Sequence, residues 1–131
     1  MSDIPSSLYY SYFLDIVPCT IGTLLFWTGV RGFANPQALA DTFGLPNATK
    51  DEVVFVQSST GRNLAAALFV WALVYMGERK ALGVFLICWT WAGIADTKLL
   101  IEHPRGEKAL VHVRNIFVLA ILGPLLIRSS T

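Results

Sequence analysis

Four long apolar stretches fill most of this 131-residue chain, and each of them contains ionisable side chains within the apolar run. They cover residues 8–30, 53–76, 81–101 and 109–127. A helix of about 20 apolar residues crosses the roughly 30 Å hydrocarbon layer of a bilayer. A charge inside such a span costs about 2.5–3.5 kcal/mol on insertion scales, so it usually faces a partner or a wet cavity. The sequence therefore predicts a small polytopic membrane protein with a polar interior.

The connections between these stretches indicate how the helices are arranged. Residues 77–80 and 102–108 are short and charged, and short turns make neighbouring helices run antiparallel. In the longer connection, 31–52, Pro36 is placed to begin a short interfacial helix to Asp41, which Gly44 and Pro46 would end. We expect an all-α fold in which residues 1–131 form one domain, a four-transmembrane-helix up-down bundle with a short interfacial segment between helices 1 and 2.

Composition and charge narrow the class of partner. Hydrophobic residues make up 54% of the chain and charged residues 15%, which favours a lipid bilayer as its surroundings. The net charge of +1 argues against nucleic acid, which attracts a strongly basic face. Cys19 and Cys88 are far apart and form no Cys-x-x-Cys motif, so we interpret both as buried apolar residues and expect no metal.

The distribution of basic residues predicts how the chain is oriented across the membrane. Five of them flank the connections 31–52 and 102–108, against three on the other side, which favours those two connections as cytoplasmic and both termini as lumenal. We expect an integral membrane protein, most simply of the endoplasmic reticulum, and the sequence leaves a homo-oligomer open.

The charges inside the spans converge in depth. At 1.5 Å per residue, Arg62 lies roughly 14 Å from the side that carries the connections 31–52 and 102–108. On the same scale Asp96 lies roughly 8 Å in, and His112 roughly 5–8 Å in. Asp15 lies toward the opposite face, and we expect it to be structural. Three helices thus place ionisable groups in one half of the bilayer.

This convergence defines the candidate site. Asp96 and His112 are candidate proton-transfer groups, and Arg62 is suited to hold or polarise a substrate oxygen. The alternative is a buried ion pair that only fixes the packing of the bundle. The residues 102, 103 and 105 are expected to be solvated turn residues. Candidate substrate-binding residues share the helix faces of these charges or flank them: Ser59, Asn63, Trp89 and Asn115.

At these residues the chain resembles a known group of proteins. Residues 61–64 (GRNL), residues 93–96 (GIAD), Gly106 and His112 form a pattern similar to that of the small four-helix membrane proteins of the DoxX-like group. The resemblance is closest to an uncharacterised fungal subgroup, a domain of unknown function found in secondary-metabolite gene clusters, and covers about residues 10–127. It implies a four-helix bundle and emphasises Arg62, Asp96 and His112. Asn63 stands where an acidic residue is common in the group.

Three functional hypotheses follow. The first is a cofactor-independent isomerase or cyclase that performs acid–base chemistry on a lipophilic polyketide or terpenoid in fungal secondary metabolism. The second is a cofactor-free oxygenase similar to the small four-helix anthrone oxygenases, in which His112 would deprotonate a phenolic substrate. The third is a non-catalytic accessory or lipid-binding membrane protein.

Overall fold

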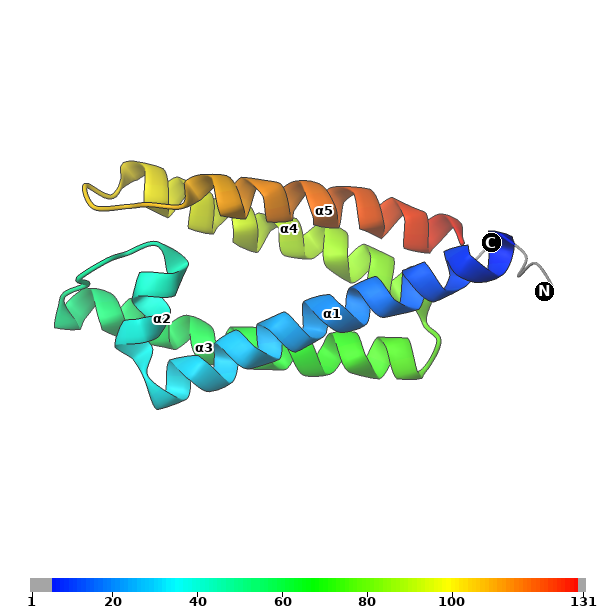
Figure 1. Cartoon of the computed structure of the whole chain (residues 1–131), viewed down its shortest axis with the longest axis horizontal. Helices are drawn as coiled ribbons and strands as arrows, with labels where there is room; N and C mark the ends of the chain where they lie inside the picture. The colour runs from blue at the N-terminus through cyan, green and yellow to red at the C-terminus, as the bar shows by residue number, and fades with distance from the viewer. Residues whose placement is uncertain (1–5, 130–131) are drawn as a thin grey trace, which may run out of the picture.

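The computed structural model describes residues 6–129, and every regular element in that part of the chain is an α-helix. This confirms the all-α prediction. Four long helices run alternately up and down, and a short helix lies at the end remote from the termini (Figure 1). The helices are α1 (Ser6–Ala34), α2 (Pro36–Phe43), α3 (Lys50–Tyr75), α4 (Arg79–Glu102) and α5 (Ala109–Arg128).

Local sequence signals set the helix ends near the connection between α1 and α3. The side chain of Asn35 caps α2 by accepting from the Ala38 backbone N–H, and Pro36 occupies the first turn, where its missing N–H is not needed. The predicted short interfacial segment is therefore helical and runs two residues beyond Asp41. Before α3, Thr49 and Glu52 form a reciprocal capping box, so this helix begins ahead of the apolar stretch.

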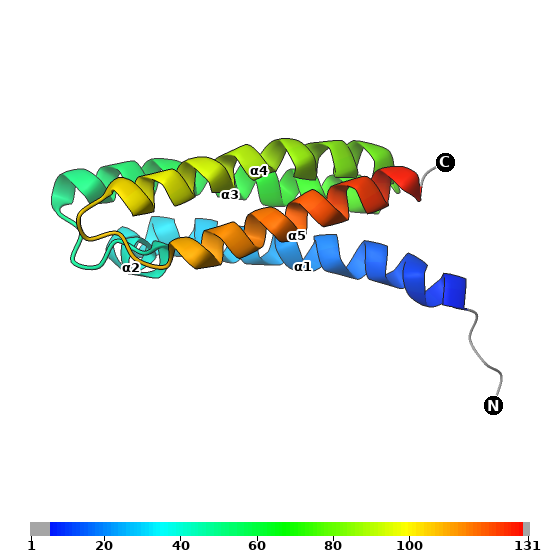
Figure 2. The same ribbon diagram turned by 90° about the horizontal axis from the view of Figure 1, so that it is seen from above.

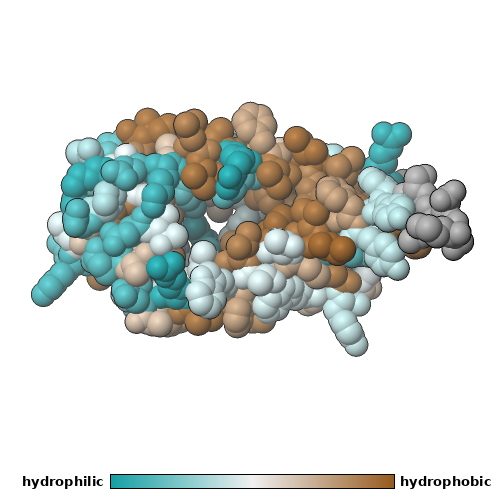
Figure 3. Space-filling model, viewed as in Figure 1, coloured by the Kyte–Doolittle hydropathy of each residue, from teal (hydrophilic) through white to brown (hydrophobic). Residues whose placement is uncertain are grey.

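The long helices associate in two pairs. α1 packs along α3, and α4 packs along α5, whereas the two pairs touch each other much less (Figures 1 and 2). Within the second pair, Gly83 and Gly123 allow the backbones to approach closely, because a Cβ on Gly83 would lie 2.5 Å from the Gly123 carbonyl oxygen. Figure 3 shows that the face is hollowed between the two pairs, beside α2.

Two separate apolar clusters join the pairs. The larger one lies toward the end that carries the termini, and the smaller one packs α2 against α3 and α4. The larger cluster consists of Leu14, Val70, Leu73, Leu82, Leu86, Leu119, Leu122 and Leu126. The smaller one consists of Leu39, Ala40, Leu45, Val56 and Leu100. Arg62 on α3 and Asp96 on α4 lie between these two clusters along their helices.

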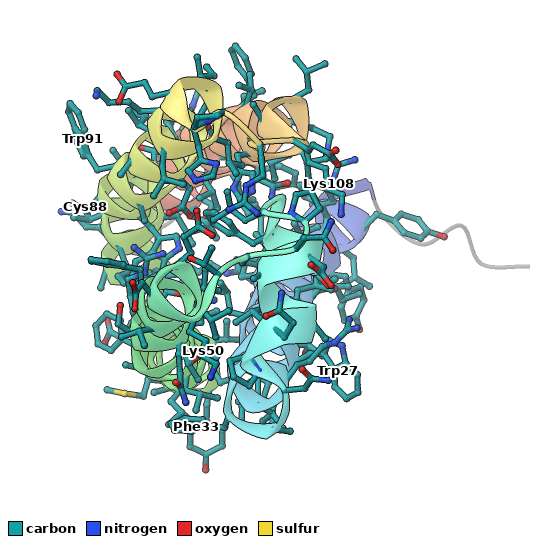
Figure 4. The ribbon with its side chains drawn as sticks, turned by 90° about the vertical axis from the view of Figure 1, so that its left-hand side faces the viewer. Trp27, Phe33, Lys50, Cys88, Trp91 and Lys108 are labelled. Atoms are coloured by element: carbon teal, nitrogen blue, oxygen red, sulfur yellow. The ribbon has the colours of Figure 1, made fainter. Side chains whose placement is uncertain are left out.

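The outer surface is mostly apolar over the long helices and hydrophilic at the α2 end (Figure 3). In the view from that end, Trp27, Phe33 and Trp91 lie at the periphery of the molecule (Figure 4), and more than 60% of each is exposed. A lipid environment accounts for such exposure of large aromatic side chains.

Three helices are long and apolar enough to cross a membrane, namely α1 over Ser7–Ala34, α4 and α5. The sequence led us to expect four such helices. α3 is long enough to cross a membrane, but it is not apolar enough. The reason lies in its first half, where Asp51, Glu52, Gln57, Ser58 and Arg62 lower the hydropathy of a helix as long as its neighbours. The structure thus agrees with a membrane protein in which three of the four long helices are long and apolar enough to cross a bilayer.

Candidate functional site

Arg62, Trp89, Asp96 and His112 meet across the gap between the helix pairs, and we call them the central cluster. A guanidinium nitrogen of Arg62 on α3 lies 3.4 Å from Asp96 Oδ1 on α4. On α5, His112 Nδ1 lies 3.9 Å from Asp96 Oδ2. The guanidinium also lies over the ring of Trp89, 5.8 Å from its centroid, at cation–π distance. The three ionisable residues whose depths along the helices agree, Arg62, Asp96 and His112, therefore do converge in the structure.

The order of residues along each helix explains why the cluster is sheltered. On α3, Arg62 lies between Val56 of the smaller apolar cluster and Val70 of the larger one. On α4, Asp96 lies in the same way between Leu100 and Leu86. The side chains of Asp96 and His112 are 22% and 16% exposed, while that of Arg62 is 40% exposed. Arg62 therefore keeps N–H groups available for a further partner.

α2 contributes a backbone group to the same place. His112 Nε2 lies 3.1 Å from the carbonyl oxygen of Phe43, the last residue of α2. The Phe43 ring also packs edge-on against the imidazole, with ring centroids 4.9 Å apart. This contact could not be predicted from the residue types, because every residue carries a main-chain carbonyl.

Three of the four candidate substrate-binding residues make no hydrogen bond to the central cluster. Ser59 donates to the Val56 carbonyl of its own helix, and Asn63 donates to Thr28 Oγ1 at 3.2 Å, which ties α3 to α1. Asn115 is exposed, and its side chain makes no hydrogen bond within residues 6–129. Only Trp89, among these four, touches a charged member of the cluster.

Glu52, His103 and Arg105 form a second charged group, here called the rim clasp, where α3 meets the turn between α4 and α5. Arg105 donates to both carboxylate oxygens of Glu52 at 2.6–2.7 Å, and His103 Nε2 lies 2.8 Å from Glu52 Oε1. The pKa of Glu52 is lowered to about 2, because hydrogen bonds stabilise its charged carboxylate. The largest effect comes from the backbone N–H of Thr49, and the next from the side chain of Arg105. We expected His103 and Arg105 to be solvated turn residues, but both contact Glu52 of α3.

Asp15 forms an ion pair at the opposite end. Arg79, the first residue of α4, donates to both oxygens of Asp15 at 2.8–2.9 Å and to the Ser11 hydroxyl at 2.8 Å. This supports the structural interpretation of Asp15, with Arg79 of α4 as its partner. The available sequence signal was that residues 15 and 79 both lie toward the side that carries the termini. Cys19 and Cys88 are free thiols, and Cys88 is exposed rather than buried.

The chemistry open to the central cluster is proton transfer next to a cation. Asp96 and His112 place a carboxylate and an imidazole side by side, and Arg62 supplies a charge that stabilises an oxyanion. Within residues 6–129, no group of three His, Cys, Asp or Glu side chains is placed to hold a metal ion.

Comparison with known proteins identifies a family. The model of a domain of unknown function, DUF4267, matches residues 22–126, which include all of α2, α3 and α4 and the whole central cluster. No curated protein and no solved structure matches the chain. Because the match covers most of the sequence, the chain belongs to the DUF4267 family.

Proposed function

We propose that this protein is an integral membrane, cofactor-independent acid–base enzyme, an isomerase or cyclase of a lipophilic small molecule that carries a carbonyl or hydroxyl oxygen. One observation supports this more than any other: Arg62, Asp96 and His112 come from three helices and meet between two apolar clusters. In this proposal α3 spans the bilayer together with the other three long helices, and its polar residues are tolerated because the charged ones face partners within the protein.

The reaction follows from the roles that the side chains can take. The imidazole of His112 removes a proton from a carbon next to the substrate carbonyl, and Arg62 stabilises the enolate oxygen. The imidazolium returns this proton to another carbon, either directly or by way of Asp96, whose Oδ2 lies 3.9 Å from His112 Nδ1. One proton leaves and one is returned, so substrate and product have the same mass, as an isomerisation or an intramolecular cyclisation requires.

The substrate class rests on different grounds. The apolar surface and the membrane setting favour a molecule that partitions into lipid. The resemblance to DoxX-like proteins of fungal secondary-metabolite clusters is the reason to name a polyketide or terpenoid, and the endoplasmic reticulum as the membrane. The similarity to small four-helix anthrone oxygenases supports the oxygenase alternative, in which the product would gain oxygen.

The test compares lipid-soluble extracts of cells that make the protein, with and without its gene, by mass spectrometry. We expect one compound to be replaced by an isomer of equal mass, and the replacement to fail in Asp96→Asn and His112→Gln. Arg114→Gln is the matched control, since Arg114 is exposed on α5 and makes no ion pair within residues 6–129.

Each other outcome changes the proposal. A product heavier by oxygen would replace isomerisation by oxygenation. Unchanged extracts from folded Asp96→Asn protein would reject proton transfer by the central cluster, and would leave its charges a role in packing only.

A further inference from the structure

The C-terminus of α2 ends at the central cluster and offers a hydrogen-bond acceptor there. The last four carbonyl groups of a helix have no partner within the helix. In α2 the carbonyl of Ala40 accepts from the N–H groups of Gly44 and Leu45, at 3.0 and 2.9 Å. The carbonyl of Phe43 instead lies 3.1 Å from His112 Nε2.

The chemistry of this contact assigns the imidazole proton. A carbonyl oxygen only accepts, so His112 Nε2 must carry a proton whether the ring is neutral or charged. In the neutral ring Nδ1 is then the bare nitrogen. Because Nδ1 is the atom that lies 3.9 Å from Asp96, the nitrogen free to exchange a proton faces the cluster.

Gly44 holds the Phe43 carbonyl in place. It has a φ of 121°, in the region that favours glycine, and a Cβ here would overlap the carbonyl of Glu107. The Gly44 carbonyl in turn accepts from the Glu107 N–H at 2.8 Å. The end of α2 is thereby fixed against the turn between α4 and α5, next to the start of the helix that carries His112.

We propose that α2 is a positioning element, in which Gly44 and the Phe43 carbonyl keep the proton of neutral His112 on Nε2 and make Nδ1 the proton-exchanging atom of the site. The catalytic meaning of this assignment rests on the proposed acid–base function. The assignment itself concerns the resting protein, so it is tested without substrate and stands or fails separately from catalysis.

The experiment is nitrogen NMR of ¹⁵N-histidine-labelled protein in lipid bicelles, above the pH at which the imidazole is charged. The chain has two histidines, so His103→Gln leaves His112 as the single labelled ring. We expect one tautomer, with the proton on Nε2 and protected from exchange. A mixture of tautomers, or a proton that exchanges as in free imidazole, would overturn the proposal.

Gly44→Ala in this background tests the role of α2. We expect the Nδ1–H form to appear and exchange of the Nε2 proton to become about fivefold faster, which corresponds to losing a hydrogen bond of about 1 kcal/mol. Gly77→Ala is the control, because Gly77 also has a positive φ, 71°, but nothing lies within 4 Å of an added Cβ. Equal spectra for the two folded variants would reject the role of Gly44. If Gly44→Ala does not fold, the tautomer and the proton exchange of His112 in the His103→Gln protein decide whether the proposal holds.

Discussion

The ion pair between Arg62 and Asp96 makes a quantitative prediction about stability. At the observed 3.4 Å, Coulomb attraction between unit charges is about 5 kcal/mol at an effective dielectric constant of 20 and about 1 kcal/mol in water. Two-fifths of the Arg62 side chain is exposed, against about one-fifth of Asp96, so the pair lies between these limits. We therefore expect a coupling energy of about 2–3 kcal/mol.

A double-mutant cycle measures this energy. Arg62→Ala, Asp96→Ala and the double variant are unfolded in mixed detergent micelles, with circular dichroism as the signal, and the coupling is the departure from additivity. Arg114→Ala combined with Asp96→Ala is the matched cycle, and we expect additivity within about 0.5 kcal/mol. A coupling below about 0.5 kcal/mol for Arg62 and Asp96 would show that the two charges do not interact as the structure has them.

Two further predictions concern the rim clasp and the pairing of helices. The folded pKa of Glu52, about 2, lies below its ordinary value of 4.5, so its contribution to stability is present above pH 4.5 and is lost as the pH falls toward 2. Melting temperatures measured across this window should fall less in Glu52→Gln than in the unaltered protein or in Glu107→Gln, and parallel curves would contradict the clasp. Gly83→Ala should destabilise the protein by about 1–3 kcal/mol through overlap with the facing helix, whereas Gly61→Ala, in open space, should be neutral or stabilising by up to about 1 kcal/mol. Equal unfolding free energies for the two alanine variants would contradict the close approach of α4 and α5.

The convergence of Arg62, Asp96 and His112 was predictable because it depends on few quantities. The ends of the apolar stretches and the rise of a helix set the depth of each charge, and the short turns set the direction of each helix. Depth is a one-dimensional property, and errors of a residue or two at the helix ends change it little.

Other contacts depend on how each helix is rotated about its axis and on which helices pair. The sequence did not determine either property. Asn63 shares α3 with Arg62, yet it lies one residue further round the helix and donates to Thr28 on α1. The pairing of α1 with α3 decides that contact, and no residue pattern specified this pairing. The acceptor at Phe43 was beyond reach for a different reason, since a backbone carbonyl is common to all residues. By contrast, the Thr49 and Glu52 capping box was readable as a Thr-x-x-Glu motif.

The most direct test of the central cluster is a distance measurement in a lipid bilayer. Solid-state NMR detects dipolar coupling between the ¹⁵N-labelled imidazole of His112, in the His103→Gln background, and the ¹³C-labelled carboxyl groups of the aspartates. With Nδ1 and Oδ2 of Asp96 3.9 Å apart, we expect strong dephasing that disappears in Asp96→Asn. Dephasing that is absent, or that persists in Asp96→Asn, would show that the imidazole and this carboxylate do not meet, and the proposed proton-transfer site would be wrong.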